Sequence, residues 1–400
     1  MGGIALTTLF TNATVIDGRG GVCEGMDVVV DDARITSVGP VASTATRNFD
    51  TVYDLQGRAL LPGLIDTHLH FAGGDYDPNT EHDSIGLAAL RGAEAAQRSL
   101  LAGFTTIRSA GARDNLDIDV RDAVNVGVIA GPRILASGRG ITMTGGHVHE
   151  TAIEADGVDE VRKAARTLIK RGVDSIKIFA ISAGVATAGS DIDTEAFTVD
   201  EIRAAVDEAH KARKLAQTHS IGLQGTKNAI AAGVDSIDHG IFLDEEACTQ
   251  MRDNGIFYVP TFGPFYYYAV RRVAEPWRVV RAEPTLEPHR KSFRLAMELG
   301  VKIAAGSDLG APSRMKNGEN ALELWLMADA GMKPEDVIVA ATSSASQLLK
   351  LDRDLGSIEE GKFADLIVCG RNPIDDIAAL QDDIKLVMKN GVVYRNELDA

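Results

Sequence analysis

Short β-type runs occupy both ends of the chain, whereas the long middle alternates apolar runs with segments of helical periodicity. Turn pairs such as Asp-Gly and Gly-Pro separate the runs at the start, and Asn390-Gly391 is a hairpin signal near the end. The ends therefore read as all-β segments. Their predicted strands are residues 9–16, 26–30, 34–38, 364–368 and 385–388.

The middle of the chain repeats a strand followed by a helix. A helix is predicted over residues 158–171, and another begins at the capping box Thr198-Val199-Asp200-Glu201. Eight such alternations are typical of an α/β fold whose parallel strands close into a (β/α)8 TIM barrel, although an open doubly wound sheet has the same periodicity. The predicted strands lie near residues 60–69, 103–108, 132–137, 174–180, 214–219, 235–239, 256–261 and 301–307.

One stretch, residues 260–288, fits neither pattern and is predicted to be a long irregular loop. It is rich in aromatic residues, from Phe262 to Trp277, and contains several arginines including Arg271 and Arg272. Irregular segments of this length are usually functional or disordered, and the aromatic content argues against disorder. The loop is therefore expected either to line a pocket or to pack against the barrel or another subunit.

Composition narrows the class of protein. With 45% hydrophobic and 24% charged residues over 400 positions, the chain can bury a large core. A formal net charge of −16 argues against nucleic acid or an anionic membrane surface as a partner. Three scattered cysteines form no disulfide framework, and no apolar run is long enough to span a membrane. A cytoplasmic location is expected.

Candidate chemistry begins with His68 and His70, which end an apolar run and share one face of a predicted strand. Two imidazoles that converge in this way can bind a divalent ion. Each further candidate could be an ordinary surface or capping residue by itself. Because catalytic groups of a barrel lie at the carboxyl ends of its strands, the coincidence favours a site. The other candidates at strand ends are Lys177, His219, His239 and Asp308.

These segments together resemble the amidohydrolase superfamily, specifically its dipeptidase, prolidase and imidazolonepropionase-like branch. The resemblance implies a barrel of residues 60–351 and a small β-sandwich that residues 1–59 and 352–400 build jointly. The motifs that carry it are Pro62 to His70, Ile176 to Phe179, Ala232 to Gly240, Gly306 to Asp308 and Leu355 to Leu366.

The resemblance also implies a centre of two divalent metal ions, with zinc expected. His68, His70 and Asp308 would hold one ion, and His219 and His239 the other. Lys177 would bridge them as a carbamate (N6-carboxylysine), in keeping with the fact that an ammonium group has no lone pair for a metal. A bridging hydroxide would attack the substrate, and Asp308 would carry the proton to the leaving amine.

Two departures from the family pattern concern the pocket. Ile221 stands where many relatives carry a second histidine, and Val148 stands where glycine is common in the turn that holds His147. His147 is nevertheless expected to orient or polarise the substrate. Tyr258 resembles a tyrosine that contacts a substrate carboxylate in relatives. Three arginines could do the same, or could be solvated charges of a helix face that pair with Glu275 or Glu283: Arg271, Arg272 and Arg278.

The expected reaction is hydrolysis of an amide bond in a dipeptide or an N-acyl amino acid. Carbamates, ureas, lactones or phosphotriesters are the alternative substrates of the same centre. A mononuclear deaminase fits less well because the strand-four Lys177 is present, and an inactive scaffold fits less well because every ligand position is filled. The expected partner is a small-molecule substrate, and a homo-oligomer is expected.

Overall fold

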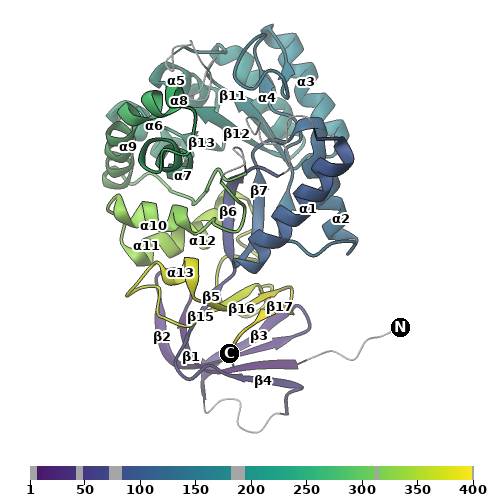
Figure 1. Cartoon of the computed structure of the whole chain (residues 1–400), viewed down its shortest axis with the longest axis vertical. Helices are drawn as coiled ribbons and strands as arrows, with labels where there is room; N and C mark the ends of the chain where they lie inside the picture. Colours follow the sequence, from purple (N-terminus) through teal and green to yellow (C-terminus); the bar gives the residue numbers. More distant parts are fainter. Residues whose placement is uncertain (1–6, 42–47, 72–82, 182–193, 311–314, 399–400) are drawn as a thin grey trace. The chain divides into compact units, whose positions relative to one another are not determined.

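The computed structural model describes residues 7–41, 48–71, 83–181, 194–310 and 315–398 (Figure 1). The chain forms two compact units. The first comprises Met1–Ile65, Arg98–Thr106 and Gly318–Ala400, and the second comprises Asp66–Gln97 and Ile107–Asn317. The predicted domain boundaries, 1–59 with 352–400 and 60–351, stay a prediction. No helix within the described ranges has the length and apolar character that a membrane crossing requires.

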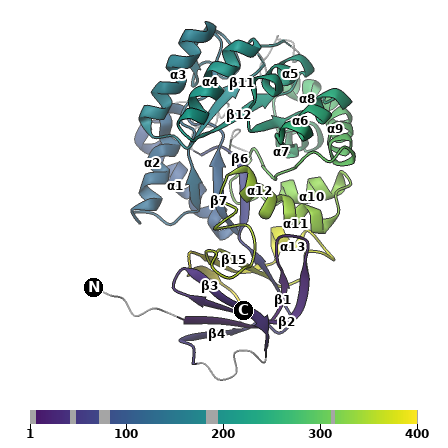
Figure 2. The ribbon, with the colours of Figure 1, turned by 180° about the vertical axis from the view of Figure 1, so that it is seen from behind.

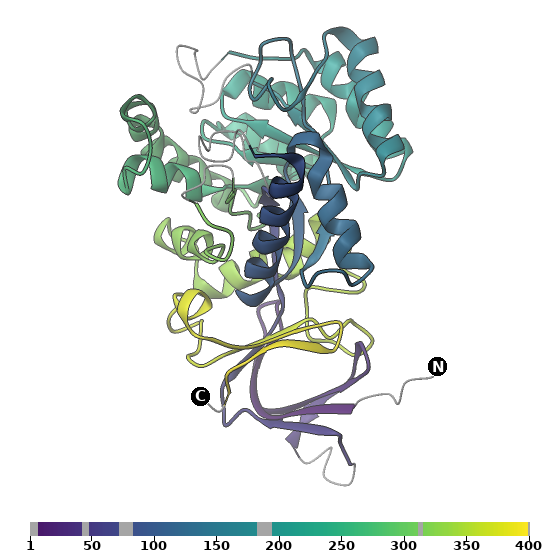
Figure 3. The ribbon, with the colours of Figure 1, turned by 45° about the vertical axis from the view of Figure 1, so that its right-hand side comes forward.

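The first unit contains an eight-stranded sheet to which both chain ends contribute (Figure 3). Strand β5 joins the two sets, because it pairs in parallel with β1 and antiparallel with β15. The order is β17-β16-β15-β5-β1-β2-β3, with β4 also on β1. The strands are β1 (Thr7–Ile16), β2 (Val22–Asp31), β3 (Arg34–Pro40), β4 (Thr51–Asp54), β5 (Ala59–Pro62), β15 (Leu366–Cys369), β16 (Ile384–Lys389) and β17 (Val392–Asn396).

This sheet folds around an apolar core. Alternate side chains such as Leu366 and Val368 on β15 point to the same face, as a period of two requires, and pack with Leu386 of β16. The predicted hairpin is confirmed: Asn390 and Gly391 have φ of 50° and 74° between β16 and β17. Both values belong to a two-residue turn whose twist matches that of the strands.

The second unit contains a six-stranded sheet, in the order β10-β9-β11-β12-β13-β14. A three-stranded sheet has the order β6-β7-β8, and its strands β6 and β7 begin in residues assigned to the first unit. Within the six-stranded sheet all pairings are parallel. The strands are β6 (Leu64–Leu69), β7 (Phe104–Ser109), β8 (Arg133–Leu135), β9 (Ile141–Thr142), β10 (Ile153–Glu154), β11 (Ser175–Phe179), β12 (Leu215–Ser220), β13 (Ser236–His239) and β14 (Phe257–Val259).

Helices follow these strands and cover the outer side of the six-stranded sheet (Figure 2). They are α3 (Gly157–Arg171), α4 (Val199–Lys211), α5 (Leu223–Ala232) and α6 (Glu245–Asn254). The predicted capping box is confirmed, since the Thr198 hydroxyl accepts from the Glu201 amide and Glu201 accepts from the Thr198 amide. The remaining longer helices are α1 (Ile85–Leu101), α2 (Leu116–Asn125), α9 (Leu286–Glu298), α10 (Leu322–Asp329), α11 (Pro334–Ala340) and α12 (Ser343–Leu348).

Two strand predictions need correction. The predicted strand 60–69 is two strands, which separate at Gly63, where a Cβ would come within 2.2 Å of the Thr105 hydroxyl. The predicted strand 301–307 is reduced to one parallel bridge between Ile303 and Tyr258. Backbone hydrogen bonds still run from Thr67 to Ala305 (2.9 Å), so this segment lies beside β6 without strand geometry.

The prediction of a long loop over residues 260–288 is wrong. Short helices fill most of it: α7 (Phe262–Phe265), a π-helix (Tyr266–Val270), α8 (Pro276–Ala282) and a 3-10 turn (Glu283–Thr285). Phe265 and Tyr268 are buried in one apolar cluster with Ala282. The aromatic residues therefore anchor helical turns, because packing outweighs their weak intrinsic helix preference.

Candidate metal centre

Four of the six predicted metal ligands lie together in the second unit: three histidines surround the carboxylate of the fourth ligand, Asp308. Asp308 Oδ1 lies 3.2 Å from His70 Nε2 and 3.4 Å from His68 Nε2. Its second oxygen lies 3.9 Å from His239 Nδ1. Ligand atoms of His68, His239 and Asp308 all fall within 4.8 Å of one another, which is close enough for one metal ion.

His219 adjoins this group through His239. Its Nδ1 lies 2.8 Å from His239 Nε2, and its own Nε2 is buried with no hydrogen-bond partner among the described residues. Burial, together with the neighbouring His239, holds the pKa of His219 well below its usual value, so the ring is neutral. A buried neutral imidazole nitrogen without a partner is what a metal ligand requires, and the residues present therefore fit a metal centre.

Lys177 on β11 completes the predicted set, but its amine has a different neighbour. The side chain is buried, and Nζ lies 3.2 Å from Asp238 Oδ2. Burial lowers the pKa of Lys177, although the charges of Asp238 and Asp308 oppose that effect. A buried lysine with a lowered pKa has access to its nucleophilic neutral form.

Contacts of the backbone hold the segment around His68 next to the segment around Asp308. Asp66 accepts hydrogen bonds from the backbone N–H of His68 (3.1 Å) and of Ser307 (3.0 Å). A Cβ at Gly306 would lie 2.8 Å from the Cβ of His68, so only glycine permits this approach. Asp308 is thereby fixed beside His68, and the Asp308 N–H donates to the His68 carbonyl at 2.7 Å.

Three non-glycine residues of the site have left-handed backbone angles. The φ values are 74° at His239, 53° at Thr261 and 53° at Asp308. This conformation costs on the order of 1–2 kcal/mol per residue and persists only where the surroundings enforce it. The Thr261 hydroxyl lies 2.6 Å from His239 Nδ1, which ties two of the strained residues to each other.

The sequence reasoning missed two buried charged residues beneath these ligands, Asp238 on β13 and Arg108 on β7. Asp238 Oδ2 lies 2.9 Å from His68 Nδ1, and Arg108 Nη2 lies 3.4 Å from Asp238 Oδ1. Burial alone would raise the pKa of Asp238, but Lys177, His68 and Arg108 together hold it well below its usual value. The sequence signals were an acid beside His239 and a lone arginine in an otherwise uncharged strand.

His147 lies against the second half of the site. Its ring centroid is 4.5 Å from that of His219 and 5.3 Å from that of Phe179. Burial, assisted by the charge of Lys177, lowers the pKa of His147 to about 3. The ring is therefore neutral near pH 7 and can act as a hydrogen-bond donor or acceptor.

The other predicted substrate contacts are Tyr258, Arg271 and Arg272. Tyr258 is fully buried, and its hydroxyl donates to the His239 carbonyl at 2.9 Å. Arg271 is exposed and lies over the rings of Tyr266 and Tyr267, 5.6 and 5.7 Å away. Arg272 forms an ion pair with Glu283. Their roles in binding substrate stay predictions.

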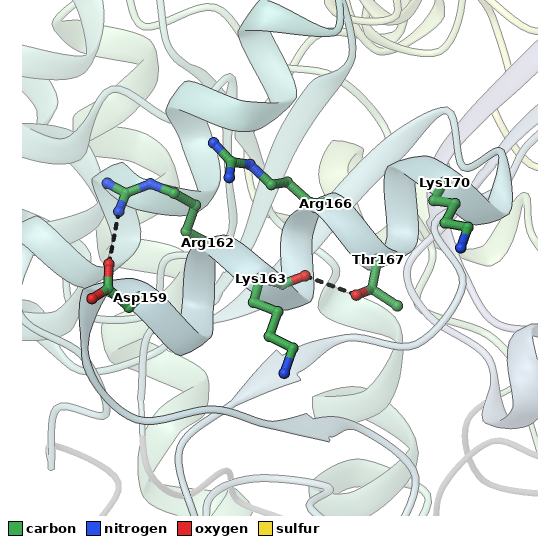
Figure 4. A pocket seen from close by; sticks show the side chains of 6 residues that line it. All are labelled: Asp159, Arg162, Lys163, Arg166, Thr167 and Lys170. Carbon is green, nitrogen blue, oxygen red and sulfur yellow. Dashed lines mark hydrogen bonds and ion pairs between the residues drawn. The ribbon is translucent and has the colours of Figure 1, made fainter.

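A separate hollow of about 320 Å³ lies on the exposed face of α3 (Figure 4). Both arginines that line it have counter-ions: Arg166 binds both carboxylate oxygens of Glu208, at 2.9 and 3.0 Å, and Arg162 pairs with Asp159 at 3.1 Å. None of its lining residues is among the histidines or acids of the metal centre. The hollow is a solvated helix face.

Comparison with known proteins identifies the family. Residues 59–394 match the Amidohydrolase family. The chain belongs to the amidohydrolase family. Ochratoxinase of Aspergillus niger is 31% identical over 98% of this chain and 87% of its own length. Imidazolonepropionase of Symbiobacterium thermophilum is 25% identical over 87% of this chain and 84% of its own length.

A solved structure of similar fold is that of a Xaa-Pro dipeptidase with bound methionine in the active site. It superimposes with a TM-score of 0.90 and 35% identity, covering 98% of this chain and all of that one. The predicted branch of the amidohydrolase family is thus confirmed, and the similar proteins are hydrolases. An α/β fold of the type found in TIM-barrel amidohydrolases follows from the same comparison.

Proposed function

We propose that this amidohydrolase is a metal-dependent enzyme that hydrolyses the amide bond of a dipeptide or an N-acyl amino acid. The observation that carries the proposal is the convergence of His68, His70 and His239 on the carboxylate of Asp308. The buried Nε2 of His219 supports it, because such an atom needs a partner and the described residues supply none.

His68, His70 and Asp308 would hold one divalent ion, and His219 and His239 a second. Lys177 would join both after its neutral amine adds to carbon dioxide and loses a proton, which gives a carbamate with two anionic oxygens. Two such ions, when bound, lower the pKa of water and polarise a carbonyl group. Zinc suits a histidine-rich set. Zinc itself, the carbamate, a cytoplasmic location and a homo-oligomer stay predictions.

Asp308 is assigned the proton transfers. The neighbouring histidines outweigh the effect of burial and hold the pKa of Asp308 well below its usual value, so the carboxylate is ready to accept a proton at neutral pH. Oδ1 is the atom that faces His68 and His70, which leaves Oδ2 to take the proton from water and pass it to the leaving amine. Neutral His147 would orient the substrate carbonyl, and Tyr258 or the exposed Arg271 and Arg272 would meet the carboxylate.

An apolar wall lies just beyond three of the strands that carry ligands. Ile181, Ile221 and Ile241 lie one or two positions beyond the ends of β11, β12 and β13. They belong to one buried cluster with Phe265 and Tyr268. The Phe265 ring also lies 6.3 Å from that of His239. We expect the substrate group on the His219 side to be apolar or aromatic, since the isoleucine and phenylalanine side chains of this cluster favour such a group.

We further propose that seven strands, β6, β7, β8, β11, β12, β13 and β14, form one closed barrel in which the segment 301–307 takes the eighth position. Three backbone hydrogen bonds support this closure: Thr67 to Ala305 (2.9 Å), Ala304 to Tyr258 (3.0 Å) and Ser175 to Ala136 (3.2 Å). The sheet built from both chain ends would then correspond to the predicted β-sandwich. Residues 60–351 and residues 1–59 with 352–400 are the proposed domains.

A substrate screen with purified protein tests the proposed function. N-acyl amino acids and dipeptides would be compared with carbamates, ureas, lactones and phosphotriesters, with metal content measured on the same samples. Amide hydrolysis that follows metal loading, at close to two ions per chain, is the expected result. Hydrolysis confined to the comparison substrates would reject the assignment, as would amide hydrolysis at full rate without metal.

A further inference from the structure

A fully buried ion pair lies beneath the metal ligands and is not itself among them. Asp238 on β13 and Arg108 on β7 both have side chains with no exposed surface. Arg108 also donates from Nε to the Thr67 carbonyl at 2.6 Å and from Nη2 to the Ser236 hydroxyl at 3.1 Å. Burying two charges is costly unless each is held by partners with good geometry, so the arrangement calls for a reason.

The two oxygens of Asp238 face different partners. Oδ1 accepts from the Ser236 hydroxyl at 2.9 Å and faces Arg108 at 3.4 Å. Oδ2 lies 2.9 Å from His68 Nδ1 and 3.2 Å from Lys177 Nζ. The single carboxylate therefore connects the fixed cation Arg108 to the two residues of the metal centre whose protonation must be controlled.

We propose that Asp238, oriented by Arg108 and Ser236, is a positioning residue that keeps the proton of His68 on Nδ1. The inference rests on the proposed metal centre for its purpose. An ionised carboxylate can only accept hydrogen bonds, and Asp238 Oδ2, 2.9 Å from Nδ1, lies nearer to the ring than Asp308 Oδ1, 3.4 Å from Nε2, so Nδ1 is the nitrogen that carries the hydrogen. The lone pair of His68 is then on Nε2, the atom that faces Asp308. A carboxylate behind a metal-binding histidine fixes its tautomer and ring orientation in this way.

Arg108 determines how the site responds to a neutral amide at position 238. In Asp238→Asn, the amide oxygen turns toward Arg108 and Ser236, because a guanidinium group cannot give up its proton. The NH2 group then faces His68 Nδ1, which must accept and moves its proton to Nε2. His68 Nε2, the nitrogen that would bind the metal, then carries a hydrogen and cannot act as a ligand, although the side chain at position 238 keeps nearly the same shape.

The tautomer can be read directly in metal-free protein by 15N NMR of labelled histidine, with the His68 signals identified by their loss in His68→Asn. At a pH where the ring is neutral, wild type is expected to carry the proton on Nδ1 and Asp238→Asn on Nε2. Asp66→Asn is the matched control, since Asp66 is an equally buried carboxylate that contacts the His68 backbone and should leave the tautomer unchanged. A wild-type proton on Nε2 overturns the proposal.

Metal affinity provides the second measurement. Titration of each metal-free variant with Zn²⁺ should show Asp238→Asn weakened about 10–100-fold, the usual effect of losing such a partner. Adding Arg108→Met should restore part of that affinity, because the NH2 group can then turn to Ser236 and return its oxygen to His68. Additive further loss in the double variant would point to a merely structural pair and contradict the proposal.

The two proposals fail in different ways. A wild-type protein with the Nδ1 proton that binds no metal would reject the proposed function and keep the tautomer assignment. An active metal enzyme with the proton on Nε2 would do the reverse. The NMR measurement on wild type needs no variant, so a failure of Arg108→Met to fold leaves the proposal testable.

Discussion

The sheet built from both chain ends and the strand ends of the second unit bury opposite kinds of side chain. Around Leu60, Val368 and Leu386 the sheet buries a continuous apolar cluster. The strands β7, β11 and β13 instead bury the charged groups of Arg108, Lys177 and Asp238. β-Strands therefore bury an apolar core in one part of this chain and charged side chains in another.

This difference helps to separate side chains that stabilise the fold from side chains that take part in chemistry. Apolar burial contributes roughly 25 cal/mol per Å² to folding, and needs no other explanation. A buried ion pair usually gives no net stability over apolar residues of similar volume. Charges kept in the second unit at such a cost, with perturbed pKa values, are typical of functional sites and support the proposed metal centre. The predictions below test this contrast.

Lys177→Met should have the largest effect, because it removes the amine while keeping the volume of the side chain. Bound metal and hydrolysis should both fall to background, whereas the melting temperature of the metal-free protein should be nearly unchanged or higher. Elemental analysis, a hydrolysis assay and calorimetry measure the three quantities. Lys302→Met, at an exposed lysine over the Phe257 ring, is the matched control. Full metal content in Lys177→Met would refute the carbamate.

Leu386→Ala should have the opposite effects to Lys177→Met: it should lower stability and leave metal binding and hydrolysis unchanged. Leu386 is fully buried in the sheet core, so truncation should lower the free energy of unfolding by about 2–5 kcal/mol. Metal content and turnover of the folded fraction should not change. Chemical denaturation measures the loss, and Val392→Ala on the neighbouring strand, 54% exposed, should shift stability by less than about 0.5 kcal/mol. Loss of metal from folded Leu386→Ala would break the contrast.

His289 predicts a pH dependence of stability. Burial lowers its pKa to about 3, while the unfolded chain protonates it near 6.5. The unfolded state thus binds more protons in this window, so stability is present above pH 6.5 and is lost as the pH falls toward 3. The slope from this residue approaches about 1.4 kcal/mol per pH unit. His289→Phe, beside Phe262 and Phe265, should flatten the measured profile by that amount; an unchanged slope would disprove it.

Ile221→His should have the smallest effect. It places a polar group in the apolar wall beside His219, so the preference for substrates with an apolar group there should fall about tenfold in kcat/KM relative to polar analogues. Metal content should stay the same. Competition assays with paired N-acyl amino acids measure the ratio. Ile221→Val, which keeps the surface apolar, should preserve the selectivity, and an identical ratio in both variants would remove Ile221 from substrate choice.

The features that could be predicted from the sequence are those that strand periodicity and short motifs indicate. His68, His70, His219, His239 and Asp308 could be found because residues at parallel strand ends meet on one edge of a sheet. Arg108 and Asp238 were missed, because their local signals, a lone arginine in a strand and an acid beside His239, do not identify a partner on a distant strand. Strand 301–307 was overpredicted for a related reason: close approach at Gly306, rather than strand pairing, sets its course.

The left-handed backbone at His239, Thr261 and Asp308 also bears on how this protein could be engineered. Glycine adopts such angles without penalty, and a β-branched residue such as Thr261 adopts them least readily. A library selected only for heat resistance would therefore drift toward glycine at these positions and discard the side chains that matter. Selection for stability in this fold should hold them constant and draw its gains from the sheet that the two chain ends share.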